Sequence, residues 1–395
     1  MASIPGSYRF RGSTADSHVL KIVRFSVVAI GTFAVAAVWY ACIIYDSSLL
    51  TSSEAGADVA TTPDAGEGGA MNDGCISALP PARPTTDDPS DADIELDFAV
   101  RAFIFDGVDG APPPLLGYNL DGLCTCPDPP ACASTVAHCD DPGGIDNGGA
   151  QLLRNFESLS GGVLFSQQVI DDDLDGGVFG MLVRVRNYNG TPNDTQVELS
   201  TFIADGVVAP DGGPSTPQWN GSDSWAVDMS GVFGSGMPIV PLHYDAAAYV
   251  SGGVLVGHFD YPLPLGFSDV DRLDVLLTQG FVTGTLTPSG PGFRIDDGMA
   301  GGRWAVSDAL QQLAYVHDPA NSNNYFCPSS PTYPQIKAVL CPALDLTVDP
   351  TAPLTATCDA LSFTLGFSAV PAQLGPVEQQ PRPTTCADAG PYTCP

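Results

Sequence analysis

The stretch IELDFAVRAFIF, residues 94–105, decides the fold class because its apolar and polar side chains alternate. Successive side chains of an extended strand point to opposite faces, so residues two apart share a face. One face would carry Ile94, Leu96, Phe98 and Val100. The other would carry Glu95, Asp97 and Arg101. A strand of this kind packs one face against a core and turns the other face to solvent.

Further stretches along the chain show strand patterns, separated by residues that form turns. The chain contains 43 Gly and 36 Pro among 395 residues, and these residue types favour turns. The strand-like stretches are 178–188, 195–204, 248–251, 254–259, 274–278, 281–287 and 361–367. Many short strands joined by such turns are typical of a sandwich or a barrel. We predict a mainly β domain over residues 91–375, an antiparallel β-sandwich of jelly-roll or lectin-like type braced by disulfides.

Two segments with helical spacing interrupt the strands. Residues 147–159 repeat apolar side chains every three to four positions: Leu152, Leu153, Phe156 and Leu159. Residues 307–316 begin with Ser307, a residue type that caps helix N-termini well. We therefore expect two short helices packed over the sheet.

An apolar segment precedes the β-rich part. Residues 25–45, FSVVAIGTFAVAAVWYACIIY, carry no formal charge and are long enough to span a bilayer as a helix. Basic residues precede the segment and acidic residues follow it, so the positive-inside rule keeps residues 1–24 in the cytoplasm and exports the rest. We favour an uncleaved transmembrane signal anchor. A lipoprotein signal that ends at a lipidated Cys42, and a signal peptide cleaved near residues 34–36, are the alternatives.

The segments on either side of the β-rich part have few bulky apolar residues. Residues 46–90 are rich in Ala, Asp, Gly, Thr and Pro, and residues 376–395 form a Pro-rich tail with a Cys pair. Neither composition buries enough apolar surface to offset the entropy of ordering the chain. We expect 46–90 to be a disordered stalk between the membrane and the domain.

The charge balance excludes one class of partner. The chain has 45 acidic and 14 basic residues, for a formal net charge of −31. Nucleic-acid binding needs the opposite sign, because basic side chains neutralise phosphates. We therefore expect no nucleic-acid partner.

Ten cysteines follow the apolar segment, an even number that suits disulfides in an oxidising compartment. The candidates are Cys75, Cys124, Cys126, Cys132, Cys139, Cys327, Cys341, Cys358, Cys386 and Cys394. Cys386 and Cys394 lie close together, and we predict a local bridge between them. A zinc site at the cluster that includes His138 and Cys139 is the alternative to disulfides there.

The sharpest motif for a metal is DDDLDG at residues 171–176. Asp171, Asp173 and Asp175 alternate and precede a Gly, as in the first half of a calcium-binding loop. The twelfth position of such a loop would be Leu182 instead of Glu, so an EF-hand is excluded. We predict a weak Ca²⁺ site in an acidic turn before the strand at 178–188.

The sequence contains few candidate catalytic groups. His243 and Asp245, and likewise His258 and Asp260, form H-x-D pairs that could act as acid and base or bind a metal. Aromatic residues that could stack on sugar rings are Trp219, Trp225, Trp304, Tyr244 and Tyr261. The chain contains no G-x-S-x-G, H-E-x-x-H, P-loop or G-x-G-x-x-G motif.

Several stretches of the chain resemble a known group of proteins. The Ala/Asp/Gly/Pro-rich stalk, GYNLDG at 117–122, GIDN at 144–147 and the strand at 361–367 resemble uncharacterised exported bacterial surface proteins of lipoprotein-like type. The resemblance implies a cell-envelope location and no particular activity.

These observations together give a functional expectation. We expect a membrane-anchored surface protein, with its C-terminal domain outside the cytoplasm. The β-domain would bind a ligand such as a glycan or a surface protein, or serve a structural role, without being an enzyme. A metal-dependent extracytoplasmic hydrolase that uses Asp and His258 is the alternative.

Overall fold

The computed structural model describes residues 77–105, 115–126, 130–160, 167–234, 236–266, 271–290, 292–318, 321–379, 386 and 390–394. All of them belong to one compact unit, Gly69–Pro395. The expected cytoplasmic N-terminus, apolar segment, Cys42 and most of the stalk lie outside the described residues.

Helices of the described part are all short. None of them combines the length and apolar character that a membrane crossing requires.

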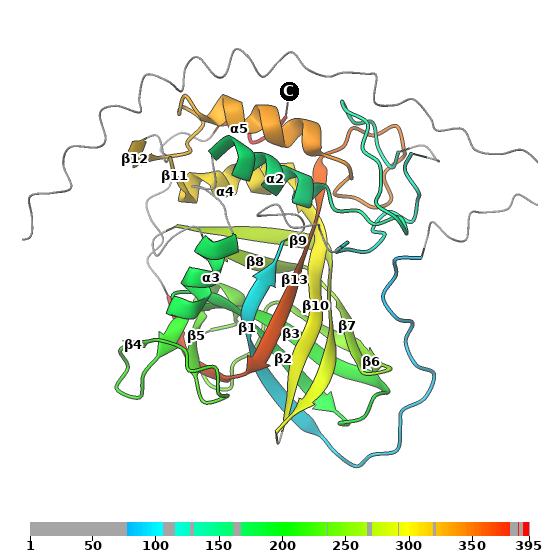
Figure 1. Ribbon diagram of the computed structural model, residues 1–395, viewed down its shortest axis with the longest axis vertical. Helices are drawn as coiled ribbons and strands as arrows, with labels where there is room; N and C mark the ends of the chain where they lie inside the picture. Colours follow the sequence, from blue (N-terminus) through cyan, green and yellow to red (C-terminus); the bar gives the residue numbers. More distant parts are fainter. Residues whose placement is uncertain are drawn as a thin grey trace, which may run out of the picture. The chain divides into compact units, whose positions relative to one another are not determined.

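The centre of the fold is a closed antiparallel barrel of eight strands. Their spatial order is β3, β2, β1, β13, β10, β9, β7, β6, and β6 pairs again with β3. In sequence order the strands are β1 (Ile94–Ile104), β2 (Gly180–Tyr188), β3 (Asp194–Val208), β6 (Tyr244–Ser251), β7 (Val254–His258), β9 (Arg272–Ser289), β10 (Gly292–Ala305) and β13 (Ala360–Pro371). Figure 1 shows these strands side by side, with β1, β13 and β10 in front.

The prediction of a β-sandwich is therefore wrong. The closing pair sets Leu199 opposite Asp245 and Val197 opposite Ala248, so the sheet has no free edge at this point. Inward and outward side chains alternate along the strands of a barrel as they do in a sandwich. The pattern of residues 94–105 is the same in both folds, and the pairing of β3 with β6 is not visible in it.

Additional strands extend this barrel on one side. The second half of β3 leaves β6 and pairs with β5 (Ser224–Asp228), which in turn pairs in parallel with β14 (Gln373–Glu378). Shorter strands complete the set: β4 (Pro214–Ser215), β8 (Tyr261–Gly266), β11 (His317–Asp318) and β12 (Asn321–Tyr325). β8 pairs with the first half of β9, whereas β7 pairs with its second half.

Two hydrophobic cores result from this arrangement. Along β2, Met181, Val183 and Val185 belong to the main core, while Leu182 belongs to a second core with Trp225. All of these side chains are fully buried. Burying one large apolar side chain contributes about 1.5–3 kcal/mol, so strand β2 is stabilised from both of its faces.

In the part of the chain that the structure describes, four α-helices accompany the strands: α2 (Gly148–Ser160), α3 (Gln167–Gly176), α4 (Val306–Gln312) and α5 (Tyr333–Leu340). Three short 3₁₀ turns, Met229–Gly231, Leu313–Tyr315 and Cys341–Ala343, follow other elements. The predicted helices at 147–159 and 307–316 correspond to α2 and α4, and α3 and α5 are additional. Figure 1 shows α2, α4 and α5 grouped over one end of the barrel, which we call the helical end.

Gly149 brings α2 close to the barrel. A Cβ atom at this position would lie 2.5 Å from Cδ2 of Phe363 on β13, closer than real Cβ contacts allow. Asn147, which precedes the helix, accepts a hydrogen bond from the Thr364 backbone N–H at 3.1 Å through Oδ1. The start of α2 is therefore fixed to the end of β13.

Candidate functional site

Disulfides brace the helical end of the barrel. Those with both partners among the described residues are Cys126–Cys139, Cys132–Cys358, Cys327–Cys386 and Cys341–Cys394. Cys124 is also disulfide-bonded, and Cys75 lies outside the described residues. The prediction of disulfide bonds is thus confirmed.

The predicted local bridge between Cys386 and Cys394 is wrong. Each of these cysteines pairs with a distant partner, at sequence separations of 59 and 53 residues. The two bridges fasten the C-terminal tail to the segment that contains α5. Cys126 and Cys139 are joined to each other, so their sulfurs are not the thiolate ligands that the zinc alternative requires.

A groove of about 590 Å³ lies among these disulfides, and we call it the cap groove. One helix face, two loops and the C-terminal tail form its walls. The lining residues are Ala133, Ser134, Thr135, Pro328, Tyr333, Pro334, Lys337, Ala338, Cys341, Pro342, Leu344, Thr357, Cys358, Pro391 and Cys394. Most of these side chains are apolar, and four are prolines whose rings are rigid. The groove is thus a concave, largely preformed apolar surface.

Helix α5 supplies the polar groups of one wall. Tyr333 and Lys337 are four residues apart, a spacing that puts both side chains on one face of the helix. Tyr333 is 5% exposed, and its hydroxyl has no hydrogen-bond partner among the described residues. Burial raises the pKa of Tyr333, and the nearby Tyr392 raises it further. This phenol therefore stays protonated at neutral pH.

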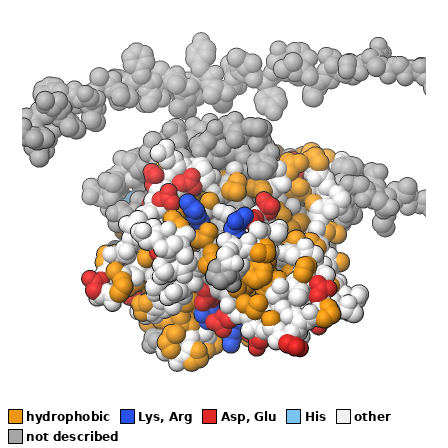
Figure 2. Space-filling view, turned by 60° about the horizontal axis from the view of Figure 1, so that its bottom comes forward, with side chains coloured by type: hydrophobic (Ala, Val, Ile, Leu, Met, Phe, Trp, Pro, Cys, Tyr) orange, Lys and Arg blue, Asp and Glu red, His pale blue; other side chains and the backbone are white. Residues whose placement is uncertain are grey.

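Lys337 is the one basic residue among the described residues that line the groove. The chain has two lysines, Lys21 and Lys337, and only Lys337 lies among the described residues. No salt bridge or hydrogen bond links its ammonium group to another described residue. Among the described residues that line the groove there is no Asp or Glu. On the face shown in Figure 2, by comparison, basic side chains are sparse among acidic and hydrophobic ones.

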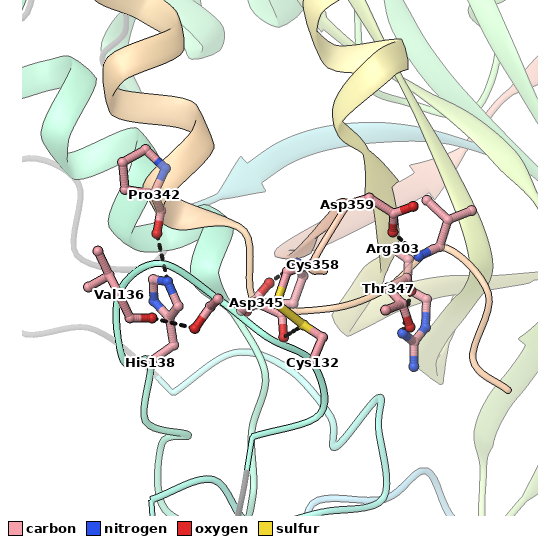
Figure 3. Close-up of a disulfide and its surroundings, with 12 residues drawn as sticks. Cys132, Val136, His138, Arg303, Pro342, Asp345, Thr347, Cys358 and Asp359 are labelled. Carbon is pink, nitrogen blue, oxygen red and sulfur yellow. Dashed lines mark hydrogen bonds between the residues drawn. A yellow bond between two sulfur atoms is a disulfide. The ribbon is translucent and has the colours of Figure 1, made fainter. Parts of the chain in front are cut away.

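A small acidic pocket adjoins the groove, and Ser134 lines both. Asp121, Asp140, Asp146 and Asp345 contribute their carboxylates to it, together with His138. Figure 3 shows Asp345 beside the Cys132–Cys358 disulfide and the His138 ring turned toward the carbonyl of Pro342, at 2.7 Å.

Burial disfavours the charged forms of these aspartates. It raises the pKa of Asp146 to about 8, and the neighbouring Asp121 adds to the effect. Burial also raises the pKa of Asp140 to about 6 and raises the pKa of Asp345, despite hydrogen bonds from Ser362. The pocket therefore carries less negative charge at neutral pH than four free carboxylates would.

Backbone and side-chain donors occupy part of each carboxylate. Leu120 N–H donates to Asp146 Oδ2 at 2.6 Å, and Thr125 N–H donates to Asp140 Oδ2 at 2.6 Å. The pocket has a volume of only about 10 Å³. Within the described ranges, no group of three or more His, Cys, Asp or Glu side chains is arranged to hold a metal ion.

The predicted calcium residues lie on helix α3, not in a turn. Ile170 and Leu174 are buried, and they give the helix an apolar stripe. Residues two apart on a helix point about 200° apart, so Asp173 faces away from Asp171 and Asp175. Asp171 accepts a hydrogen bond from Gln167 Nε2 at 2.9 Å. Binding of calcium by these three residues remains a prediction, and it would require α3 to change its conformation.

The two H-x-D pairs do not join an imidazole to a carboxylate. Asp245 Oδ2 accepts from the backbone N–H of His258 at 2.9 Å, and His243 Nδ1 lies 3.0 Å from the backbone oxygen of Asp260. Burial lowers the pKa of His258, which keeps the ring neutral. A different pair does have this geometry, since His317 Nδ1 lies 2.5 Å from Asp271 Oδ1.

Three of the five candidate sugar-stacking residues are in the cores. Trp225, Trp304 and Tyr261 are 0%, 6% and 0% exposed. Trp219 packs against Trp225, with ring centroids 5.5 Å apart, and Tyr244 is 47% exposed. These side chains therefore do not form one aromatic surface.

Comparison with protein-family models, with curated proteins and with solved structures finds no match for this chain. The functional proposal accordingly rests on the chain's own residues. Lys337 and Tyr333 were not among the predicted site residues. The signal for Lys337 is its rarity, because it is the one lysine in the expected exported part of so acidic a chain.

Proposed function

We propose that this chain is a membrane-anchored extracytoplasmic protein whose barrel domain binds a ligand in the cap groove without converting it. The observation that carries the proposal is the groove itself. Its volume of about 590 Å³ lies in the range of small-molecule sites, roughly 300–1,000 Å³. Its mainly apolar lining with a few polar groups is the usual chemistry of such sites.

The extracytoplasmic location has separate support. Disulfides persist in oxidising compartments and are rare in the cytosol. Four of them join described residues, and two form part of the groove lining. The apolar segment at 25–45 and the charges around it favour export with retention at the membrane.

An apolar ligand fits the lining better than a glycan does. Sugar sites commonly offer an exposed aromatic face, whereas Tyr333 is buried and most of the remaining lining is aliphatic, proline or cysteine. Polar side chains are a minority there: Ser134, Thr135, Thr357 and Lys337. A ligand with hydrocarbon surface gains about 25 cal/mol for each Å² of apolar area that it removes from water. The groove therefore favours a ligand that is mostly hydrocarbon.

Photolabelling of the full chain tests this proposal. Membrane preparations that carry the chain would be exposed to a neutral alkyl probe with a photoreactive group, and the labelled peptides mapped by mass spectrometry. We expect labels on peptides that contain Ala133–Thr135 and Tyr333–Ala338. Ala338→Trp and Thr135→Trp fill the groove from opposite walls and should each remove this labelling.

The matched control is Ala246→Trp, which adds the same indole at an exposed position outside the groove. It should leave the labelling unchanged. Labelling that persists in both groove-filling variants would contradict the proposal. Turnover in a panel of hydrolase substrates, lost in His258→Ala with the fold intact, would instead support the hydrolase alternative.

A further inference from the structure

The ammonium group of Lys337 has no partner among the described residues of the domain. It lies on the groove face of α5, half-buried, and no described residue forms an ion pair or hydrogen bond with it. Some of the described arginines do form ion pairs: Arg272 contacts Asp205, Asp228 and Asp274, and Arg184 contacts Asp97. A cation left unpaired in a chain with 45 acidic residues is available to an anion from outside.

The hydroxyl of Tyr333 is a second polar group for which the described residues supply no partner. It is buried, and burying a hydroxyl without a hydrogen bond costs about 1–3 kcal/mol. Tyr333 itself lies about one helical turn before Lys337 on α5. An ammonium and a phenol on one helix face are two donors, and a carboxylate has two oxygens that accept.

The residues around Lys337 in the cap groove favour a ligand that carries one negative charge and is otherwise apolar. The described residues of the groove lining contribute one cation and no carboxylate, a charge that matches a monovalent anion. The adjoining acidic pocket repels such an anion less than its four aspartates suggest, because burial raises the pKa of Asp146 to about 8 and also raises the pKa of Asp345. The prolines, Leu344, Ala338 and the two disulfides offer only apolar contact.

We propose that the cap groove binds a single-chain amphiphile with a carboxylate headgroup, in other words a fatty acid. The carboxylate would pair with Lys337 and accept from Tyr333, and the hydrocarbon chain would lie along the proline and disulfide walls. This inference rests on the proposed function, because it specifies the ligand of the same groove.

Paired photoreactive probes test the headgroup. A long-chain carboxylic acid and the alcohol of equal chain length would carry the same photoreactive group, and both would be applied to membranes that contain the full chain. We expect about fivefold more labelling of the groove by the acid, because one favourable ion pair increases affinity by about this factor. Lys337→Met, which removes the charge and keeps an unbranched side chain one atom shorter, should reduce labelling by the acid to the level of the alcohol.

Arg294→Met is the matched control, since it removes one positive charge outside the groove lining. It should retain the preference for the acid. Equal groove labelling by acid and alcohol in the wild type, or a preference that survives Lys337→Met, would overturn the inference while leaving the proposed function intact. Loss of labelling by both probes from the groove would instead contradict the proposed function. A phosphate-headed single-chain probe that labels better than the acid, with the same dependence on Lys337, would also overturn the carboxylate assignment.

Discussion

Tyr333 and Lys337 lie one turn apart on α5, and both line the groove between the Cys132–Cys358 and Cys341–Cys394 disulfides. Neither polar group has a partner within the described ranges of the chain. Polar groups that bind a ligand often lower the stability of the protein without its ligand. Substitutions of Tyr333 and Lys337 allow this effect on the free energy of unfolding to be measured.

Tyr333→Phe should therefore raise the free energy of unfolding. The substitution removes a buried hydroxyl that has no partner and keeps the ring, so we expect a gain of about 0.5–1 kcal/mol. Urea unfolding followed by circular dichroism gives the value. A loss of more than about 1 kcal/mol would show that the hydroxyl is hydrogen-bonded in the folded protein.

Lys337→Met should leave stability almost unchanged. The ammonium group has no ion pair to lose, and surface substitutions of this kind usually change stability by less than about 0.5 kcal/mol. The same urea titration checks this. A large loss would mean that Lys337 has a structural role, which would contradict its assignment to ligand binding.

The disulfide pattern predicts specific cross-linked peptides. Mass spectrometry of the non-reduced chain should join Cys327 to Cys386 and Cys341 to Cys394. In the loop-entropy model, bridges that close loops of this length contribute about 4 kcal/mol each. Cys341→Ser with Cys394→Ser should thus lower the melting temperature and open the groove. A peptide that joins Cys386 directly to Cys394 would contradict the structure.

Protonation of Asp146 links stability to pH. Its pKa is about 8 in the folded protein, raised by burial first and by Asp121 second, whereas an unfolded aspartate has a pKa of about 3.9. The folded state thus binds a proton more tightly than the unfolded state. The stability associated with this proton is fully present below pH of about 4, and it is lost as the pH rises to about 8.

Asp146→Asn should remove this part of the pH dependence. The amide oxygen can still accept from Leu120 N–H, and the side chain carries no charge at any pH. Urea titrations between pH of about 5 and 9 should show a smaller fall in stability for this variant. Asp211→Asn, at an exposed position, is the control. An unchanged pH slope in Asp146→Asn would contradict the assignment.

Calcium binding at Asp171, Asp173 and Asp175 is tested by melting curves with millimolar calcium and with chelator. At ten times the dissociation constant, binding would add about 1.4 kcal/mol, and Asp173→Ala should remove the gain. Circular dichroism should also report a loss of helix, because α3 must unwind for the three carboxylates to converge. Equal melting temperatures would show that the acidic run is only the exposed side of α3.

Local patterns predicted elements better than they predicted the arrangement of those elements. The stretches 178–188 and 361–367 correspond to β2 and β13, because alternation follows from side-chain direction along one strand. Closure of the barrel depends on β3 changing partner from β6 to β5, which is a relationship between distant strands. No local pattern in the sequence carries it.

Tertiary packing explains the other differences. Asp has low helix propensity, so DDDLDG suggests a turn, yet Ile170 and Leu174 bury one side of α3 and the helix forms. The tail cysteines find partners near α5 because the folded chain brings them together, although Cys386 and Cys394 are closer in sequence. The groove likewise combines residues 133–135, 333–344 and 391–394, which the sequence separates widely.

Hydrogen–deuterium exchange of the full chain, with and without a long-chain carboxylic acid, tests the central claim most directly. Groove binding predicts slower exchange in peptides that cover α5 and residues 133–135, and no slowing in Ala338→Trp. Unchanged exchange in those peptides at saturating acid, or slowing that persists in Ala338→Trp, would contradict ligand binding in the cap groove.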